Sequence, residues 1–186
     1  MTRPGGQPAG FDAPSARGTH KKRPVDLRDE RRNRAHSCWD HLVVAPFFVS
    51  YEVNLGTLLR TCDAVGACMV VPHTPGARAA MKKGNTLRIR SCVHWAGRPA
   101  NWLAKQQAQG ARIVGVELAD DAIRLADVEM ARQKTIVVLG HEHHGIPDDV
   151  WPLLDDVVEI PMLGVGQSLN VAVAGSLVLY KLAGLA

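Results

Sequence analysis

From about residue 40 onward, short apolar runs alternate with stretches whose apolar residues recur every three or four positions. The runs are rich in valine and isoleucine, which favours strands, whereas the other stretches have the period of an amphipathic helix. The predicted strands are Leu42–Val49, Cys68–Val71, Cys92–Trp95, Arg112–Glu117, Thr135–Leu139 and Asp156–Ile160. The predicted helices are Val53–Val65, Arg98–Gln109, Pro147–Leu154 and Leu169–Leu182. This alternation predicts an α/β fold, an open and mostly parallel sheet with helices on both faces.

The beginning of the chain lacks this pattern. Residues 1–34 hold nine Lys and Arg against four Asp and Glu, a charge of +5, so the rest of the chain carries −1 of the total of +4. A basic segment with few apolar residues cannot build a core of its own. We therefore predict a basic, flexible arm over residues 1–36 and one folded domain over residues 37–186. The arm could contact nucleic acid or only keep the protein in solution.

The composition is that of an ordinary globular protein, with 46% hydrophobic and 22% charged residues. No apolar run approaches the ~20 residues that cross a bilayer, and no secretory signal is visible. We therefore expect a cytoplasmic protein without a membrane partner. The cysteines form no C-x-x-C pair, which favours free thiols in a reducing compartment over a zinc or redox motif. They are Cys38, Cys62, Cys68 and Cys92.

Three segments share one order: a buried strand, a polar or glycine-rich turn, and the start of a helix. They are Asn54–Arg60, Leu139–Ile146 and Ile160–Val171. In the third, Gly164 and Gly166 give a flexible loop, and Ser168 is the predicted N-cap of the last helix. Ligands of open α/β sheets bind beyond the carboxyl ends of the strands. The three segments are therefore predicted to form one site.

The order N-x-G-x-x-x-R, then G-x-E-x-x-G-I, then I-P-M-x-G-x-x-x-S-L-N-V resembles the three motifs of the SpoU/TrmH branch of the SPOUT RNA methyltransferases. The resemblance covers roughly residues 38 to 184. It implies a C-terminal trefoil knot, S-adenosylmethionine as cofactor and a ribose 2′-hydroxyl of RNA as methyl acceptor. It also implies a homodimer with sites built from both subunits. The substrate could be tRNA or rRNA, and the absence of an evident separate RNA-binding domain favours tRNA.

The resemblance also implies a set of catalytic residues. They are Asn54, Arg60, Glu142, Ser168 and Asn170. An isolated arginine stays protonated, so Arg60 is expected to bind a phosphate or the 2′-oxygen, and to act as a base only where its surroundings remove its proton. Asn54 could cap its helix or bind substrate, and Glu142 could orient Arg60, bridge to Asn170 or accept a proton. Ser168 and Asn170 are expected on the first turn of the last helix, where free N–H groups can meet a phosphate.

Two further sets of residues are expected to bind ligands. An apolar slot with backbone hydrogen-bond partners would suit adenine, and its predicted residues are Leu118, Leu139, Gly140, Gly145, Ile160, Met162, Ser168 and Leu169. A basic cluster without any acid within thirteen residues is predicted to face RNA phosphates. Its members are Arg78, Lys82, Lys83, Arg88 and Arg90.

Three other functions compete with this interpretation. His141, His143 and His144 lack the spacing of a catalytic zinc site, so no metal is predicted. The run from Gly164 to Leu169 begins like a dinucleotide-binding motif, but Leu169 replaces its third glycine. A non-catalytic RNA-binding or assembly protein on the same fold remains an alternative. The presence of all the signature polar residues favours the enzyme.

Overall fold

The computed structural model describes residues 42–84 and 92–186. Its strands form a seven-stranded sheet in the order β3-β2-β1-β6-β4-β7-β5, and every neighbouring pair runs parallel. The strands are β1 (Leu42–Ala45), β2 (Cys68–Pro72), β3 (Val93–Ala96), β4 (Arg112–Val116), β5 (Ile123–Arg124), β6 (Thr135–Leu139) and β7 (Asp156–Glu159). This sheet confirms the predicted open, parallel α/β fold.

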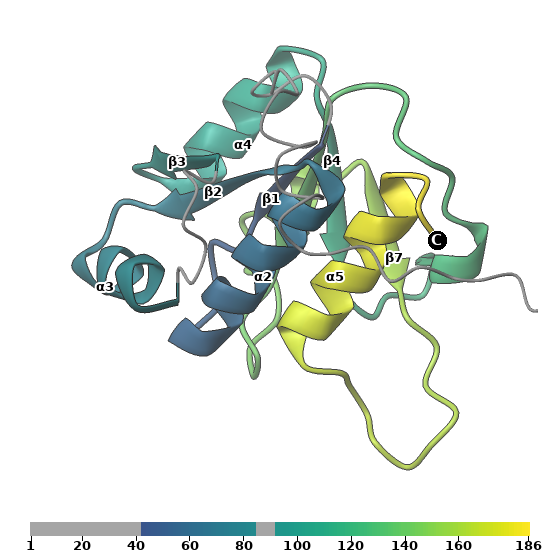
Figure 1. Ribbon diagram of the computed structural model, residues 1–186. Coiled ribbons are helices and arrows are strands. Elements are labelled where there is room, and N and C mark those ends of the chain that lie inside the picture. The colour runs from purple at the N-terminus through teal and green to yellow at the C-terminus, as the bar shows by residue number, and fades with distance from the viewer. Residues whose placement is uncertain (1–41, 85–91) are drawn as a thin grey trace, which may run out of the picture. The chain divides into compact units, whose positions relative to one another are not determined.

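Helices cover both faces of the sheet. They are α2 (Glu52–Val65), α3 (Pro75–Gly84), α4 (Pro99–Ala108) and α5 (Val171–Leu182), with the 3₁₀ turns η1 (Leu125–Asp127) and η2 (Trp151–Leu153). On one face α2 and α5 lie side by side, with α3 against α2, as Figure 1 shows. On the other face Leu103 of α4 joins a separate core cluster with Val43 and Ile136. No helix among the described residues is long and apolar enough to cross a membrane.

The central strands are buried on both faces. All residues of β1 and β6 are buried, which explains why both read as unbroken apolar runs in the sequence. The approach of α5 to this sheet depends on Gly175. A Cβ at Gly175 would lie 2.7 Å from Leu139 Cδ1 and 3.0 Å from Leu58 Cδ2. Gly175 therefore lets α5 pack closely against β6 and α2 without displacing these leucine side chains.

Two of the predicted elements end or begin elsewhere. The first strand ends at Ala45 instead of Val49, because Pro46 has no N–H for the strand ladder and a turn follows it. The last helix begins at Val171 instead of Leu169. Its N-cap is Asn170, whose side-chain oxygen accepts the N–H groups of Ala172 and Val173, so the prediction of Ser168 as N-cap is wrong.

Two predictions of helices also need correction. The helix predicted over Pro147–Leu154 is only the 3₁₀ turn η2, since prolines at both 147 and 152 remove backbone donors. Helix α3 was not predicted, although Pro75 suits a first helical position and Thr74 Oγ1 accepts the N–H of Ala77 at 3.1 Å. Its buried side chains Ala77, Ala80 and Met81 have helical spacing.

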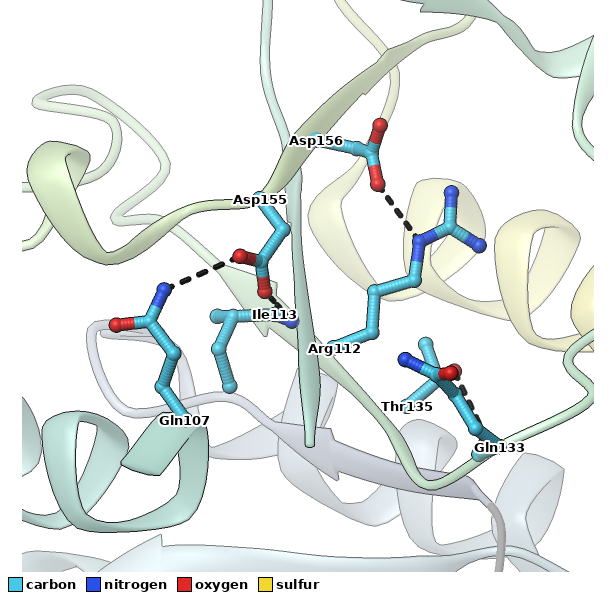
Figure 2. A network of polar contacts seen from close by, with 7 residues as sticks. All are labelled: Gln107, Arg112, Ile113, Gln133, Thr135, Asp155 and Asp156. Carbon is cyan, nitrogen blue, oxygen red and sulfur yellow. Dashed lines mark hydrogen bonds and ion pairs between the residues drawn. The ribbon is translucent and has the colours of Figure 1, made fainter. Parts of the chain in front are cut away.

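Polar contacts join the amino ends of β4 and β7 to each other and to α4 (Figure 2). Arg112, the first residue of β4, donates from Nε to Asp156 Oδ2 at 2.6 Å, where β7 begins. Asp155 accepts the N–H of Ile113 at 2.7 Å and the side-chain amide of Gln107 at 3.1 Å. Because the strands are parallel, these contacts lie at the end of the sheet opposite to the three sequence motifs. We assign them to holding β4 and β7 in register.

Candidate active site

The three motif segments meet beyond the carboxyl ends of the strands, as predicted. A cavity of about 330 Å³ lies there, lined by the ends of β4, β6 and β7 and by the loop that leads into α5. Six of the eight residues predicted to bind the cofactor line this cavity. They are Leu118, Gly140, Ile160, Met162, Ser168 and Leu169. The cavity thus combines apolar side chains with the backbone of two of the motifs.

The other two predicted cofactor residues, Leu139 and Gly145, do not line the cavity. Leu139 is the last residue of β6 and is fully buried in the core beside Gly175. Gly145 closes the turn that follows β6, exchanging two backbone hydrogen bonds of 2.9 Å with His141. Its φ of +66° favours glycine, and a Cβ there would lie 2.5 Å from Glu117 Oε2. Both residues support the wall of the cavity from behind.

Gly140 has a steric role in the same turn. A Cβ at this position would lie 2.5 Å from the carbonyl carbon of Gly145 and 2.7 Å from the backbone nitrogen of Ile146. Backbone atoms cannot move aside as the end of a side chain can. The turn after β6 therefore requires the glycine, and the close packing leaves the Gly140 backbone on the cavity wall.

A hydrogen-bonded chain of three side chains joins the three motifs. Asn54 donates from Nδ2 to Glu142 Oε1 at 2.7 Å, and its Oδ1 accepts from Asn170 Nδ2 at 3.0 Å. Asn170 and Glu142 line the cavity, whereas Asn54 lies behind them with 4% of its surface exposed. Helix α2 begins at Glu52 after Tyr51, so the alternative in which Asn54 caps this helix is wrong. Its side chain instead connects Glu142 to Asn170.

The environment of Glu142 keeps it ionised. Burial alone would raise the pKa of Glu142, but the backbone N–H groups of Ser50, Glu142 and Tyr51 and the Asn54 amide stabilise its carboxylate. Together they lower this pKa below its ordinary value. The distances from Ser50 N and Tyr51 N to the carboxylate are 2.9 Å and 3.2 Å. A carboxylate of lowered pKa is a weaker proton acceptor and a better anchor for the donors around it.

Arg60 and Ser168 are placed differently from the three joined residues. Ser168 is exposed in the loop two residues before the N-cap, so the expectation that Ser168 and Asn170 lie on the first turn of the helix is wrong. Ser168 nevertheless lines the cavity. Arg60 is exposed on α2 and does not line the cavity of its own chain. Six residues along a helix turn the chain by about 240°, so Arg60 points away from the side of α2 that carries Asn54.

Sequence reasoning missed Glu117, which also lines the cavity. It directly follows β4, and its carboxylate accepts the N–H of Leu118 at 3.2 Å and that of Ile146 at 3.3 Å. The signal was available, because Glu117 is an acidic residue at the carboxyl end of a predicted buried strand. His141 is a second cavity residue that the sequence did not single out for cofactor binding.

The predicted RNA-binding cluster lies partly on α3. Arg78 and Lys82 are exposed there, and Lys83 belongs to the same helix. The Arg78 guanidinium stands over the ring of Trp95 with its carbon 5.2 Å from the centroid, and one of its nitrogens lies 3.1 Å from His73 Nε2. Arg88 and Arg90 lie outside the described residues. The described part of the cluster is therefore a cationic surface with an aromatic neighbour.

Comparisons with known proteins agree with these motifs. The chain is 31% identical over 143 residues to a tRNA (guanosine(18)-2′-O)-methyltransferase of Aquifex aeolicus, a match that covers 75% of this chain and 67% of the relative. The chain spans 56% to 67% of the length of the bacterial relatives that it matches.

Solved structures share the fold. The TrmH/SpoU tRNA modifying enzyme of A. aeolicus superposes with a TM-score of 0.66 at 25% identity, covering 87% of this chain and 83% of that enzyme. The SpoU methyltransferase AviRb of Streptomyces viridochromogenes, in complex with the cofactor AdoMet, gives a TM-score of 0.63 at 24% identity, covering 80% and 58% of the two chains.

The family itself is shown by a match over most of the domain. The family model described as the SpoU rRNA Methylase family matches residues 41–180, a range that contains all three motifs, the whole cavity and the Glu142–Asn54–Asn170 contacts. The chain belongs to the SpoU rRNA Methylase family.

Proposed function

We propose that the chain is an S-adenosylmethionine-dependent methyltransferase that methylates a ribose 2′-hydroxyl of tRNA in preference to rRNA. The observation that carries this proposal is the side-chain series Glu142–Asn54–Asn170, which joins the three family motifs beside a cavity. The similarity of the chain to tRNA (guanosine(18)-2′-O)-methyltransferases supports tRNA as the substrate and makes guanosine 18 the first position to examine.

The cavity fits the proposed cofactor in size and chemistry. Its volume of about 330 Å³ falls within the range of small-molecule sites. Ile160, Met162 and Leu169 offer apolar contacts for adenine, and the wall at Gly140 offers backbone atoms for its polar edge. When bound, the cofactor supplies a methyl group activated by a sulfonium. The apolar and glycine residues are proposed to orient it toward the acceptor.

The polar residues are proposed to position the acceptor. Most of the acceleration of an in-line transfer can come from holding its two partners in place. Glu142 holds Asn54 and the backbone before α2, and Asn54 holds Asn170. Asn170 and Ser168 line the cavity and offer an amide and a hydroxyl to the ribose or its phosphate. Because the pKa of Glu142 is lowered, we propose it as an anchor instead of the general base.

Arg60 is proposed to act in the site of a second subunit. It is exposed on α2 and does not line the cavity of its own chain. A homodimer that places α2 near the partner's cavity would bring the guanidinium to the acceptor phosphate or 2′-oxygen, where a planar, permanent cation suits the chemistry. Arg60 would then contribute to catalysis without lining its own cavity.

The exposed face of α5 supports a homodimer. Val173, Leu177 and Tyr180 form a helical stripe with 46%, 41% and 37% of their surfaces exposed. The opposite side of α5 is already buried in the core through Val178 and Leu179. A peripheral helix needs only one apolar face, so a second one indicates an interface.

Two further features are proposed on the family resemblance. A C-terminal trefoil knot is supported by the path of the chain, because a long loop leads from β7 to α5, which returns to pack against α2 and β6. Residues 1–36 are proposed to form a basic arm on the domain of residues 37–186, where their positive charge would bind RNA phosphates. We place the protein in the cytoplasm, where its proposed substrate and cofactor are both present.

The function is tested with purified protein, labelled S-adenosylmethionine and a tRNA transcript. Mapping of 2′-O-methylation should locate the product on one ribose, and the same tRNA with a 2′-deoxyribose at that position should accept no methyl group. Methylation of a base would contradict the proposal that a ribose 2′-hydroxyl is the acceptor. A non-catalytic RNA-binding protein would bind the tRNA but release no heat in isothermal titration with S-adenosylmethionine.

A further inference from the structure

Two cysteines and a histidine meet on β2 and β3, the two outermost strands at one edge of the sheet. Cys68 begins β2, Cys92 immediately precedes β3, and His94 is the second residue of β3. The pairing of Met69 with Val93 and Val70 with His94 sets Cys68 opposite Cys92. Residues two apart in a strand share a face, so Cys92 and His94 point the same way. The Cys92 sulfur lies 2.9 Å from that of Cys68 and 3.0 Å from His94 Nε2.

We propose that Cys68, Cys92 and His94 bind one Zn²⁺ ion. Thiolate sulfur and imidazole nitrogen are the donors that zinc prefers in proteins. The three donor atoms lie within 4.8 Å of one another. Two thiolates on one tetrahedral zinc ion are about 3.8 Å apart, given bonds of about 2.3 Å. Small outward rotations of the side chains would therefore admit the ion.

The presence of His94 favours zinc over a disulfide. A Cys68–Cys92 disulfide would need only the two sulfurs. Here the Cys92 sulfur has two neighbours, the Cys68 sulfur and His94 Nε2, as in a cluster of metal ligands. Cys68 is buried, and Cys92 and His94 are half-buried. The described residues offer three ligands, which leaves a fourth position for water or another donor. The sequence concealed this set because its cysteines come from two strands, 24 residues apart.

The position of the cluster points to a structural role. Cys68 and Cys92 lie where β2 and β3 begin, at the end of the sheet opposite to the cavity. The chain between these cysteines holds α3 and all five residues of the basic cluster, Arg78 to Arg90. A zinc ion would close this segment into a loop at its base, which lowers the conformational entropy that ordering it costs. The link to RNA rests on the proposed function, whereas zinc binding does not.

Zinc binding is tested with the reduced full-length chain by replacing zinc with Co²⁺. We expect one Co²⁺ per chain, with a thiolate-to-cobalt absorption band that Zn²⁺ displaces. Cys92→Ser and His94→Gln should each weaken binding at least tenfold, and the sulfur band should fall in Cys92→Ser. The matched control is His144→Gln, since His144 is exposed on the turn after β6, at the end of the sheet opposite to the three proposed ligands. This control should bind like the original chain.

Several results would overturn the inference. Wild-type protein that binds no stoichiometric cobalt would do so. Binding as tight in Cys92→Ser and His94→Gln as in the original chain would do so too, as would loss of binding in His144→Gln. A Cys68–Cys92 disulfide found by mass spectrometry in place of the metal would also overturn it. The effect on RNA is measured separately, as affinity for tRNA with and without zinc. Metal binding without methyl transfer would uphold the zinc site and contradict the proposed function.

Discussion

Asn170 donates its side-chain amide to the side-chain oxygen of Asn54 at 3.0 Å, across 116 residues of the chain. The same Asn170 caps α5 through its own oxygen, and the same Asn54 donates to Glu142. The N-terminus of α5, the first turn of α2 and the turn after β6 are thus fixed to one another by two amide side chains. This connection accounts for the family motifs as a structural unit and leads to the first prediction.

Asn54→Asp should destabilise the protein and reduce methyl transfer. The change removes the Nδ2 donor and sets a second carboxylate near Glu142, where the present contact is 2.7 Å. Loss of a buried hydrogen bond with an unpaired group costs about 1–3 kcal/mol of unfolding free energy. Urea unfolding measures this cost, and part of the stability should return at acidic pH as the pair takes up a proton. Asn101→Asp, on the exposed surface of α4, is the matched control and should unfold like the original chain.

The free energy of unfolding should decrease as the pH is lowered, and part of this decrease should depend on Glu142. The folded pKa of Glu142 is lowered, so the unfolded chain binds a proton more readily. The contribution of Glu142 is therefore complete above its ordinary pKa of 4.5 and is lost as the pH falls through the lower folded value. Glu142→Gln should flatten this part of the curve of unfolding free energy against pH, whereas Glu129→Gln, at an exposed site, should leave it unchanged. Identical curves for Glu142→Gln and the original chain would show that Glu142 is not the group responsible.

The sheet could be predicted in good part from the sequence, because its central strands β1 and β6 are buried throughout and read as apolar runs. The order of the strands could not, since pairing is decided by contacts between distant segments. Helix α3 could not be predicted, because its buried residues Ala77, Ala80 and Met81 include two small alanines and so give only a weak periodic apolar pattern. In the segment that forms η2, apolar periodicity favoured a helix, and two prolines limited it to a single turn.

The site could be predicted as a set of segments but not as a geometry. The motifs identified Glu142, Asn54 and Asn170, yet which of them touch depends on the first turn of α2 facing the turn after β6. The sequence also favoured Ser168 as the helix cap, because serine is a good N-cap and spacing alone cannot separate it from Asn170 two positions later. The Cys68–Cys92–His94 cluster lay beyond sequence reasoning because it exists only through strand pairing.

Gly140→Ala should weaken binding of S-adenosylmethionine and lower stability together. The new Cβ would lie 2.5 Å from the Gly145 backbone, so the turn must open and the cavity wall must move. Overpacking of this kind costs about 1–3 kcal/mol. Gly97→Ala is the matched control between β3 and α4, where a Cβ meets nothing within 4 Å and the residue does not line the cavity. Isothermal titration and thermal unfolding of both variants separate the two effects. If Gly140→Ala binds S-adenosylmethionine as tightly as the original chain, this turn does not belong to the cofactor site.

Arg60→Ala should reduce methyl transfer by about two orders of magnitude or more while leaving cofactor affinity nearly unchanged, since Arg60 is exposed and does not line the cavity of its own chain. Arg60→Lys should restore little, because lysine lacks the planar fork. Single-turnover rates and cofactor titrations measure the two quantities. Near-normal turnover in Arg60→Ala would contradict a role for this residue at the acceptor.

The two subunits can be tested against each other by mixing variants. Met162→Arg should fill the cavity, since Met162 lines it and is 37% exposed, and so inactivate cofactor binding without unfolding the chain. If Arg60 serves the partner's cavity, a heterodimer of Arg60→Ala and Met162→Arg chains contains one complete site and should regain activity. If Arg60 serves its own cavity, neither site is complete and the mixture should stay inactive.

Leu177→Lys should shift the protein from dimer to monomer. Leu177 lies in the middle of the exposed α5 stripe with 41% of its surface exposed, so a lysine is tolerated by the monomer but would bury an unpaired charge in an interface. Ala104→Lys is the matched control, because Ala104 is exposed on α4, which covers the face of the sheet opposite to α5. Sedimentation velocity at micromolar concentration should give a dimer for the original chain and for Ala104→Lys, and a monomer for Leu177→Lys. Because Arg60 is proposed to act across the interface, the monomer should also lose methyl transfer. Full activity in a Leu177→Lys monomer would still support α5 as the dimer interface but would refute an active site shared between subunits.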